Sequence, residues 1–104
     1  MELTKDATKL ICTVYKSFLE KRKSGESKAN AKHFEPDYYK TLSPISSWSD
    51  ADIMDTLAEL KRAGFLKLYI NGGFQLNDEA IIFMEKRFKN GLVEVSDFIS
   101  KFIP

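Results

Sequence analysis

The residue types that most often carry enzyme chemistry are scarce in this chain. Its 104 residues include one histidine, His33, and one cysteine, Cys12. A zinc site built from histidine and cysteine usually takes about four ligands, so these two residues cannot supply one. No histidine or acid stands near Cys12 in a recognisable nucleophile–base order, and no glycine-rich phosphate loop is present. The sequence therefore predicts a protein that is not an enzyme, with no catalytic residue, no metal and no cofactor.

Basic side chains gather between residues 16 and 33, where lysine and arginine outnumber the acids. The formal net charge of the whole chain is only +1, which argues against binding nucleic acid through bulk charge. A basic loop can still hold phosphate groups without reading sequence; the alternative is a solvated loop whose lysines favour solubility. The cluster consists of Lys21, Arg22, Lys23, Lys28 and Lys32.

A second charged surface falls on a helix that the pattern predicts over residues 49–63. Ser49 and Asp52 form a pair similar to a capping box at its start, and Gly64 follows its end. Apolar residues recur along one stripe, and at about 100° per residue the charged positions point the other way. The buried stripe consists of Ile53, Leu57 and Leu60; the outward and flanking acids are Asp52, Asp55 and Glu59; the outward cations are Lys61 and Arg62.

The elements before this helix are predicted from caps and spacing. Thr4 can cap a first helix that runs to about Lys23. Residues 29–34 hold either a short strand or no regular structure. Pro36 suits the first turn of a short helix through Leu42.

Two short strands around residues 71–73 predict a hairpin. A two-residue turn would mix apolar and polar side chains on both faces of the hairpin. A three-residue loop with Gly73 in the left-handed region pairs Leu68 with Leu76 and Ile70 with Phe74, which gives one apolar face. We therefore predict the three-residue loop.

Two helices are predicted after the hairpin. Asn77 is expected to cap a helix over residues 78–89, and an Asn-Gly pair separates it from a last amphipathic helix over residues 92–103. The apolar side chains of this last helix favour a homodimer seam, and the alternative is that the helix folds back on the first helix and completes the core. The seam residues are Val95, Phe98, Ile99 and Phe102.

The order helix, short helix, helix, hairpin, helix resembles the winged-helix superfamily. The local match is LAELKRAGFL at residues 57–66, followed by the hairpin and by LNDEA at residues 76–80, which is similar to a run common in small bacterial and phage winged-helix proteins. The resemblance covers residues 4–89. It implies an α+β fold, mostly α, in which a three-helix core carries a short β-hairpin wing, with additional C-terminal helices.

The resemblance also implies a function. In DNA-binding relatives the second helix of the helix-turn-helix enters the major groove and the wing contacts the backbone or the minor groove. Residues 49–63 would then be the recognition helix and residues 71–73 the wing tip of a transcription regulator that binds double-stranded DNA. The DNA-contacting residues would be Lys21, Arg22, Lys23, Lys28, Lys32, Lys61 and Arg62. The alternative is a winged-helix interaction module that does not bind DNA, in which Asp52, Asp55 and Glu59 meet a basic protein partner.

Length and composition predict one domain over residues 1–104. A single cysteine fits a reducing compartment, and no apolar segment is long enough to serve as a secretory or membrane-spanning segment. We therefore expect a cytoplasmic protein that does not enter the membrane.

Overall fold

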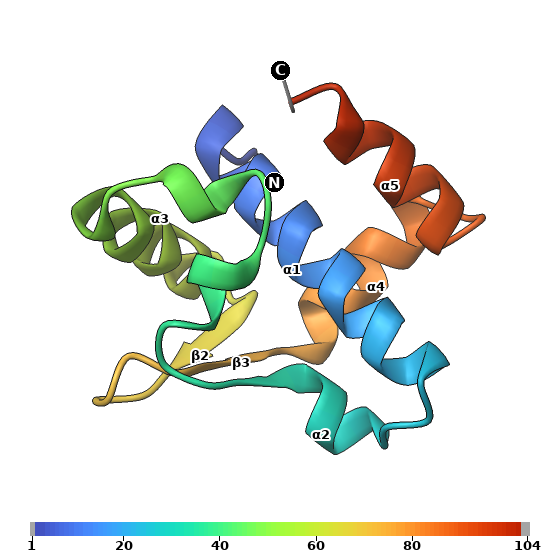
Figure 1. Ribbon diagram of the computed structural model, residues 1–104, viewed down its shortest axis with the longest axis horizontal. Coiled ribbons are helices and arrows are strands. Elements are labelled where there is room, and N and C mark those ends of the chain that lie inside the picture. The colour runs from blue at the N-terminus through green and yellow to red at the C-terminus, as the bar shows by residue number, and fades with distance from the viewer. Residues whose placement is uncertain (1, 103–104) are drawn as a thin grey trace.

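The computed structural model describes residues 2–102 and has an α+β fold that is mostly helical, with one small antiparallel sheet (Figure 1). The elements in chain order are α1 (Lys5–Lys23), α2 (Lys28–Lys32), β1 (His33–Phe34), the 3₁₀ helices η1 (Tyr38–Thr41) and η2 (Ile45–Ser47), α3 (Asp50–Arg62), β2 (Leu66–Leu68), β3 (Phe74–Leu76), α4 (Asp78–Arg87) and α5 (Leu92–Ser100).

Helix α1 is the centre of the molecule. Figure 1 shows it between α3 on one side and α4 and α5 on the other, and it contacts all three. Thr4 caps it as predicted, because its Oγ1 accepts a hydrogen bond from the Ala7 backbone N–H at 3.1 Å. Apolar side chains of α1 are buried over most of its length, and Cys12 is fully buried among them. The reason is that helices cover α1 from more than one direction.

The sheet has the strand order β1-β3-β2, and the predicted hairpin register is wrong by two residues. Leu66 pairs with Leu76 and Leu68 pairs with Phe74, so the connecting loop spans residues 69–73. Within this loop Gly72, not Gly73, has the positive φ, at 92°. A shift of two residues keeps every strand side chain on its predicted face, because the side-chain period of a strand is two. Alternation alone therefore cannot distinguish the two registers.

The segment between α1 and α3 also differs from the prediction. Ser27 caps a short helix, α2, where a strand or irregular structure was expected, and β1 begins only at His33. The helix predicted from Pro36 is reduced to the 3₁₀ turn η1. Asp37 has a φ of 65°, a left-handed conformation that a right-handed helix starting at Pro36 cannot contain.

The last two helices begin where the sequence predicts and end earlier. Asn77 occupies the capping position of α4, but its side chain does not cap the helix and instead donates to the Gly64 carbonyl at 3.1 Å. Helix α4 ends at Arg87 rather than at residue 89, and α5 ends at Ser100. Residue 103, the end of the predicted last helix, lies outside the described residues. The buried core extends beyond residue 89, since Val95 and Ile99 of α5 belong to it.

Candidate functional site

The outward face of α3 combines acids with an exposed apolar side chain. Ala51, Asp52 and Asp55 are exposed, and Met54, at the edge of this face, keeps 45% of its surface in solvent. Ser49 Oγ accepts from the Asp52 backbone N–H at 3.1 Å, which fixes the first turn of the helix. The predicted buried stripe of this helix is confirmed, so its acids do point away from the core.

Glu59, the third predicted acid, is bound within the fold. Its two carboxylate oxygens accept from the backbone N–H and the hydroxyl of Thr4, at 3.0 and 2.7 Å. These hydrogen bonds hold the pKa of the Glu59 carboxyl below its ordinary value of 4.5. Glu59 therefore joins the end of α3 to the start of α1, and only Asp52 and Asp55 of the predicted set are free to meet a partner.

Asp50, at the first position of α3, also has an internal partner. Its Oδ1 accepts from the Tyr39 hydroxyl at 2.5 Å, and this bond raises the pKa of Tyr39 to about 12. The bond connects η1 to the start of α3. It therefore positions the helix that carries the acidic face.

Lys21 belongs to the fold rather than to a free basic surface. Its ammonium group donates to the His33 carbonyl at 2.9 Å and lies over the rings of Phe34 and Tyr38, at 3.9 and 4.8 Å from their centroids. Burial lowers the pKa of this ammonium group. The predicted phosphate contact at Lys21 would require breaking a cation–π and hydrogen-bonded arrangement that connects α1 to β1.

Two more lysines of the basic cluster are paired with one acid. Lys32 Nζ lies 2.8 Å from Asp78 Oδ1, and Lys28 Nζ lies 3.6 Å from the same atom. The Lys32 side chain is only 16% exposed. The hydrogen bond from Lys32 and the two positive charges lower the pKa of Asp78. The pairing therefore neutralises part of the basic cluster.

The remaining cations of the predicted DNA-contacting set are exposed. Arg22 donates to the Glu26 carbonyl at 3.1 Å, whereas Lys23 stands in solvent at the end of α1. Lys61 and Arg62 are exposed at the C-terminal end of α3. The seven predicted contacts thus fall at the C-terminal ends of α1 and α3 and on α2.

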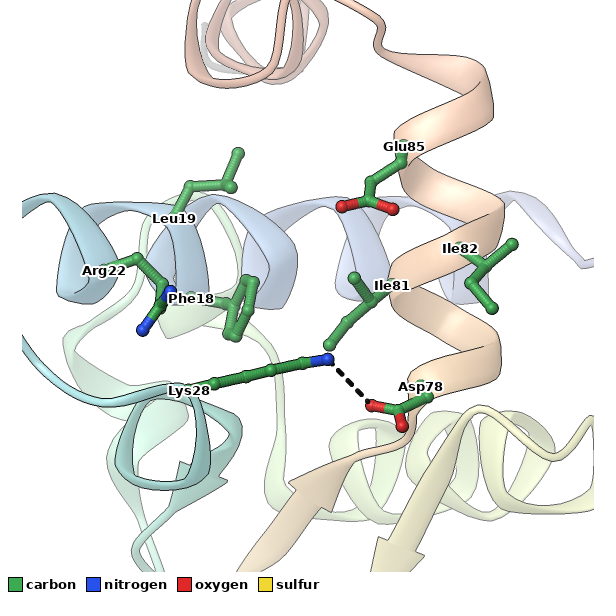
Figure 2. A pocket seen from close by; sticks show the side chains of 8 residues that line it. All are labelled: Phe18, Leu19, Arg22, Lys28, Asp78, Ile81, Ile82 and Glu85. Carbon is green, nitrogen blue, oxygen red and sulfur yellow. Dashed lines mark ion pairs between the residues drawn. The ribbon is translucent and has the colours of Figure 1, made fainter.

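A groove of about 450 Å³ lies between α1, α2 and α4 (Figure 2). Arg22 and Lys28 come from one side of it, and Asp78 and Glu85 come from the other. Because cations and carboxylates face each other across the groove, it offers no field of one sign to a phosphate. The apolar lining consists of Phe18, Leu19, Ile81 and Ile82.

The hairpin tip is apolar and has no basic residue. Ile70, which was predicted to pair with Phe74 on the apolar face, is fully exposed in the loop. Asn71 Oδ1 accepts from the Gly73 backbone N–H at 2.9 Å and so closes a tight turn. Met54, Ile70 and Val93 are among the exposed apolar residues that the sequence patterns missed. A helical wheel places Met54 on the edge of the apolar stripe, so its exposure is decided by what packs nearby.

Half of the predicted dimer seam is buried inside the monomer. Val95 and Ile99 are 0% and 1% exposed, because α5 packs against α1. The seam prediction is wrong for these two residues, and the alternative, that α5 folds back on the first helix, accounts for them. Phe98 and Phe102 stay partly exposed and contact each other edge to face at 5.1 Å.

The Cys12 thiol lies in the core. Burial raises the pKa of the Cys12 thiol to about 11, so the thiolate form is rare near neutral pH. Residues 2–102 contain no group of three or more metal-ligating side chains. Within the same range, no helix has the length and apolar character needed to cross a membrane.

No family model, no curated protein and no solved structure matches this chain. Its function is therefore inferred from the geometry of its own surfaces. The acidic face of α3 is one surface on which a single element presents both exposed charge and exposed apolar area.

Proposed function

We propose that the chain is a winged-helix interaction module in which the exposed face of α3 binds a basic protein segment. The winged-helix part of the proposal is supported by the order of α1, β1, α3 and the β2–β3 hairpin, and by the strand order β1-β3-β2. In this reading α3 is the helix that a DNA-binding relative would place in the major groove.

The observation that carries the proposal is the composition of the exposed face of α3. Asp52 and Asp55 are exposed on this face, Met54 is exposed at its edge, and Ala51 between them is small enough to let a partner approach the helix closely. Carboxylates beside an apolar edge complement an amphipathic segment whose own apolar residues lie beside lysine or arginine. The partner class is therefore a basic amphipathic peptide or helix.

DNA binding is the second candidate, and the exposed cations at two helix ends favour it. Lys61 and Arg62 extend from α3, and Arg22 and Lys23 extend from α1. Contact with phosphates supplies most of the non-specific affinity for DNA. Asp52 and Asp55 oppose this function because α3 is the helix that would enter the major groove, where their carboxylates would be repelled by the phosphates. The engagement of Lys21 and Lys32 within the fold further reduces the charge available for DNA.

Fluorescence anisotropy with two labelled probes separates the candidates. One probe is an amphipathic peptide of lysine and leucine, and the other is a mixed-sequence DNA duplex, each titrated at low and at physiological salt. The interaction proposal expects the peptide to bind, and the variant Asp52→Lys/Asp55→Lys to weaken that binding by about tenfold or more, since two charge reversals face the peptide directly. The matched control Glu20→Lys/Asp97→Lys makes the same change in net charge at exposed positions on α1 and α5.

Each result has a defined meaning. If the peptide does not bind, or if the α3 variant binds it as tightly as the control does, the proposed function is wrong. Duplex binding that weakens steeply with salt and is lost in Arg22→Glu/Lys23→Glu would establish the DNA candidate instead. Circular dichroism of every variant confirms that the fold is retained.

A further inference from the structure

Helix α4 has an exposed face that contains two apolar side chains between two opposite charges. Ile82 is 51% exposed and Phe83 is partly exposed, with its ring 5.2 Å from that of Phe65. Glu79 precedes this pair and Lys86 follows it, and both are exposed. Figure 2 shows the Ile81 side chain pointing into the groove and the Ile82 side chain on the opposite side of α4. The face of α4 that points away from the core therefore has an apolar centre, with a negative charge at one end and a positive charge at the other.

The spacing of these four residues is symmetric along the helix. Glu79 and Lys86 are equally far from the midpoint between Ile82 and Phe83. Glu79 and Lys86 are seven positions apart, which is about 10.5 Å along the helix axis and close to two full turns. Both charges therefore lie on the same face. If α4 of a second copy packs antiparallel about that midpoint, Glu79 of each copy lies against Lys86 of the other. In the same way, Ile82 of each copy lies against Phe83 of the other. Such a surface is self-complementary, as an interface with twofold symmetry requires.

The position of α4 leaves room for this contact. In Figure 1, α4 and α5 lie on the opposite side of α1 from α3. No described element covers Ile82, which is why its side chain remains half in solvent. A pairing through α4 would therefore leave the acidic face of α3 open on each copy.

We propose that the chain forms a weak homodimer by antiparallel packing of α4 against α4 of a second copy. The two Glu79–Lys86 pairs set the direction of packing, and Ile82 and Phe83 form the apolar centre. Helix α4 is about 15 Å long, which is short for an interface of the standard size of about 1,600 Å². The dimer is accordingly weak and concentration-dependent. This inference does not depend on the proposed function of α3, although a dimer would present two α3 faces to a partner.

Sedimentation velocity of charge-reversal variants tests both the surface and the direction of packing. In Glu79→Lys, lysine faces lysine at both pairs, and in Lys86→Glu, glutamate faces glutamate. Each variant alone is expected to be monomeric at concentrations up to about 1 mM, where the parent self-associates. An equimolar mixture of the two variants restores a lysine–glutamate pair at both positions, so the mixture is expected to dimerise as the parent does. A parallel packing would set like charges together in the parent as well as in each variant, so it does not predict that the parent alone associates more strongly than each variant.

Two control variants change the net charge equally at exposed positions on α1, namely Glu20→Lys and Lys5→Glu, and they are expected to associate like the parent. A monomeric parent over the whole concentration range overturns the proposal. A Glu79→Lys variant that associates like its control also overturns the proposal. A mixture that stays monomeric, when each variant is folded and is monomeric alone, overturns it too. Recovery in the mixture also shows that neither variant failed through unfolding.

Discussion

Replacing Lys21 with alanine tests whether the basic cluster is a free surface or a part of the fold. The Lys21 ammonium group donates to the His33 carbonyl at 2.9 Å and lies 3.9 Å from the centroid of the Phe34 ring. Lys23 is two residues away in the same last turn of α1 and stands in solvent. The variant Lys23→Ala is therefore a matched control, because it removes the same side chain from the same helix end without removing these contacts.

The expected loss follows from the contacts. A hydrogen bond from a charged donor contributes about 1.5 kcal/mol, and a cation–π contact contributes about 0.5 to 1 kcal/mol at a partly exposed site. The ammonium group is partly desolvated, which lowers its pKa and offsets part of this gain. We expect Lys21→Ala to lower the free energy of unfolding by about 1.5 kcal/mol, and Lys23→Ala by less than about 0.5 kcal/mol.

Thermal and urea denaturation measure this difference. For a domain of this size, a loss of about 1.5 kcal/mol lowers the melting temperature by roughly 6 to 12 °C. Equal melting temperatures and urea midpoints for the two variants would refute the reasoning, because Lys21 would then contribute no more than a solvated lysine. In that case all three cations at the end of α1 would be available to a phosphate backbone, and DNA binding would become the stronger candidate.

Three further predictions concern other parts of the fold. Glu59 has a pKa below 4.5 in the folded state, so its carboxylate stabilises the fold above about pH 4.5 and this contribution is lost as pH falls through the folded pKa. Urea titrations at about pH 7 and about pH 3.5 should show Glu59→Gln losing about 0.5 kcal/mol at the higher pH, after allowance for solvent exposure, and less at the lower pH. An equal loss at both would contradict the assignment. Val95→Asp buries a carboxylate and should unfold the protein by circular dichroism, whereas Phe98→Asp should stay folded; the reverse order would contradict the packing of α5 on α1. Cys12 should react with a thiol reagent only after denaturation, and rapid reaction of the native protein would show that the core opens.

Where the sequence predicted an element correctly, the signal came from residues close together in the chain. Thr4 and Ser49 cap the helices that their positions predict, and the three-residue stripe of α3 is buried as its spacing requires. The wrong predictions share a different cause. The hairpin register depends on a turn whose alternatives differ by two residues, so both place Leu68, Phe74 and Leu76 on the apolar face, and Ile70 moves into the loop.

The candidate site was predictable in part. Spacing alone showed that Asp52 and Asp55 point outward on α3. It could not show that Glu59 is bound by Thr4, because the two residues are 55 positions apart in the chain and meet only when α1 packs against α3. The same limit explains the basic cluster, whose Lys32 is paired with Asp78 at a separation of 46 positions.

The sequence by itself therefore determined the four longer helices, α1, α3, α4 and α5, and which charges of α3 face outward. Caps and periodic spacing are local, and their free energies are decided within a few residues. Only the tertiary structure decided which of those charges remain free and which apolar faces remain uncovered. Val95 and Ile99 on α5 and Ile82 on α4 are all apolar side chains of amphipathic helices, and the first two are buried while the third is not, because α1 covers α5 and no described element covers the outer face of α4.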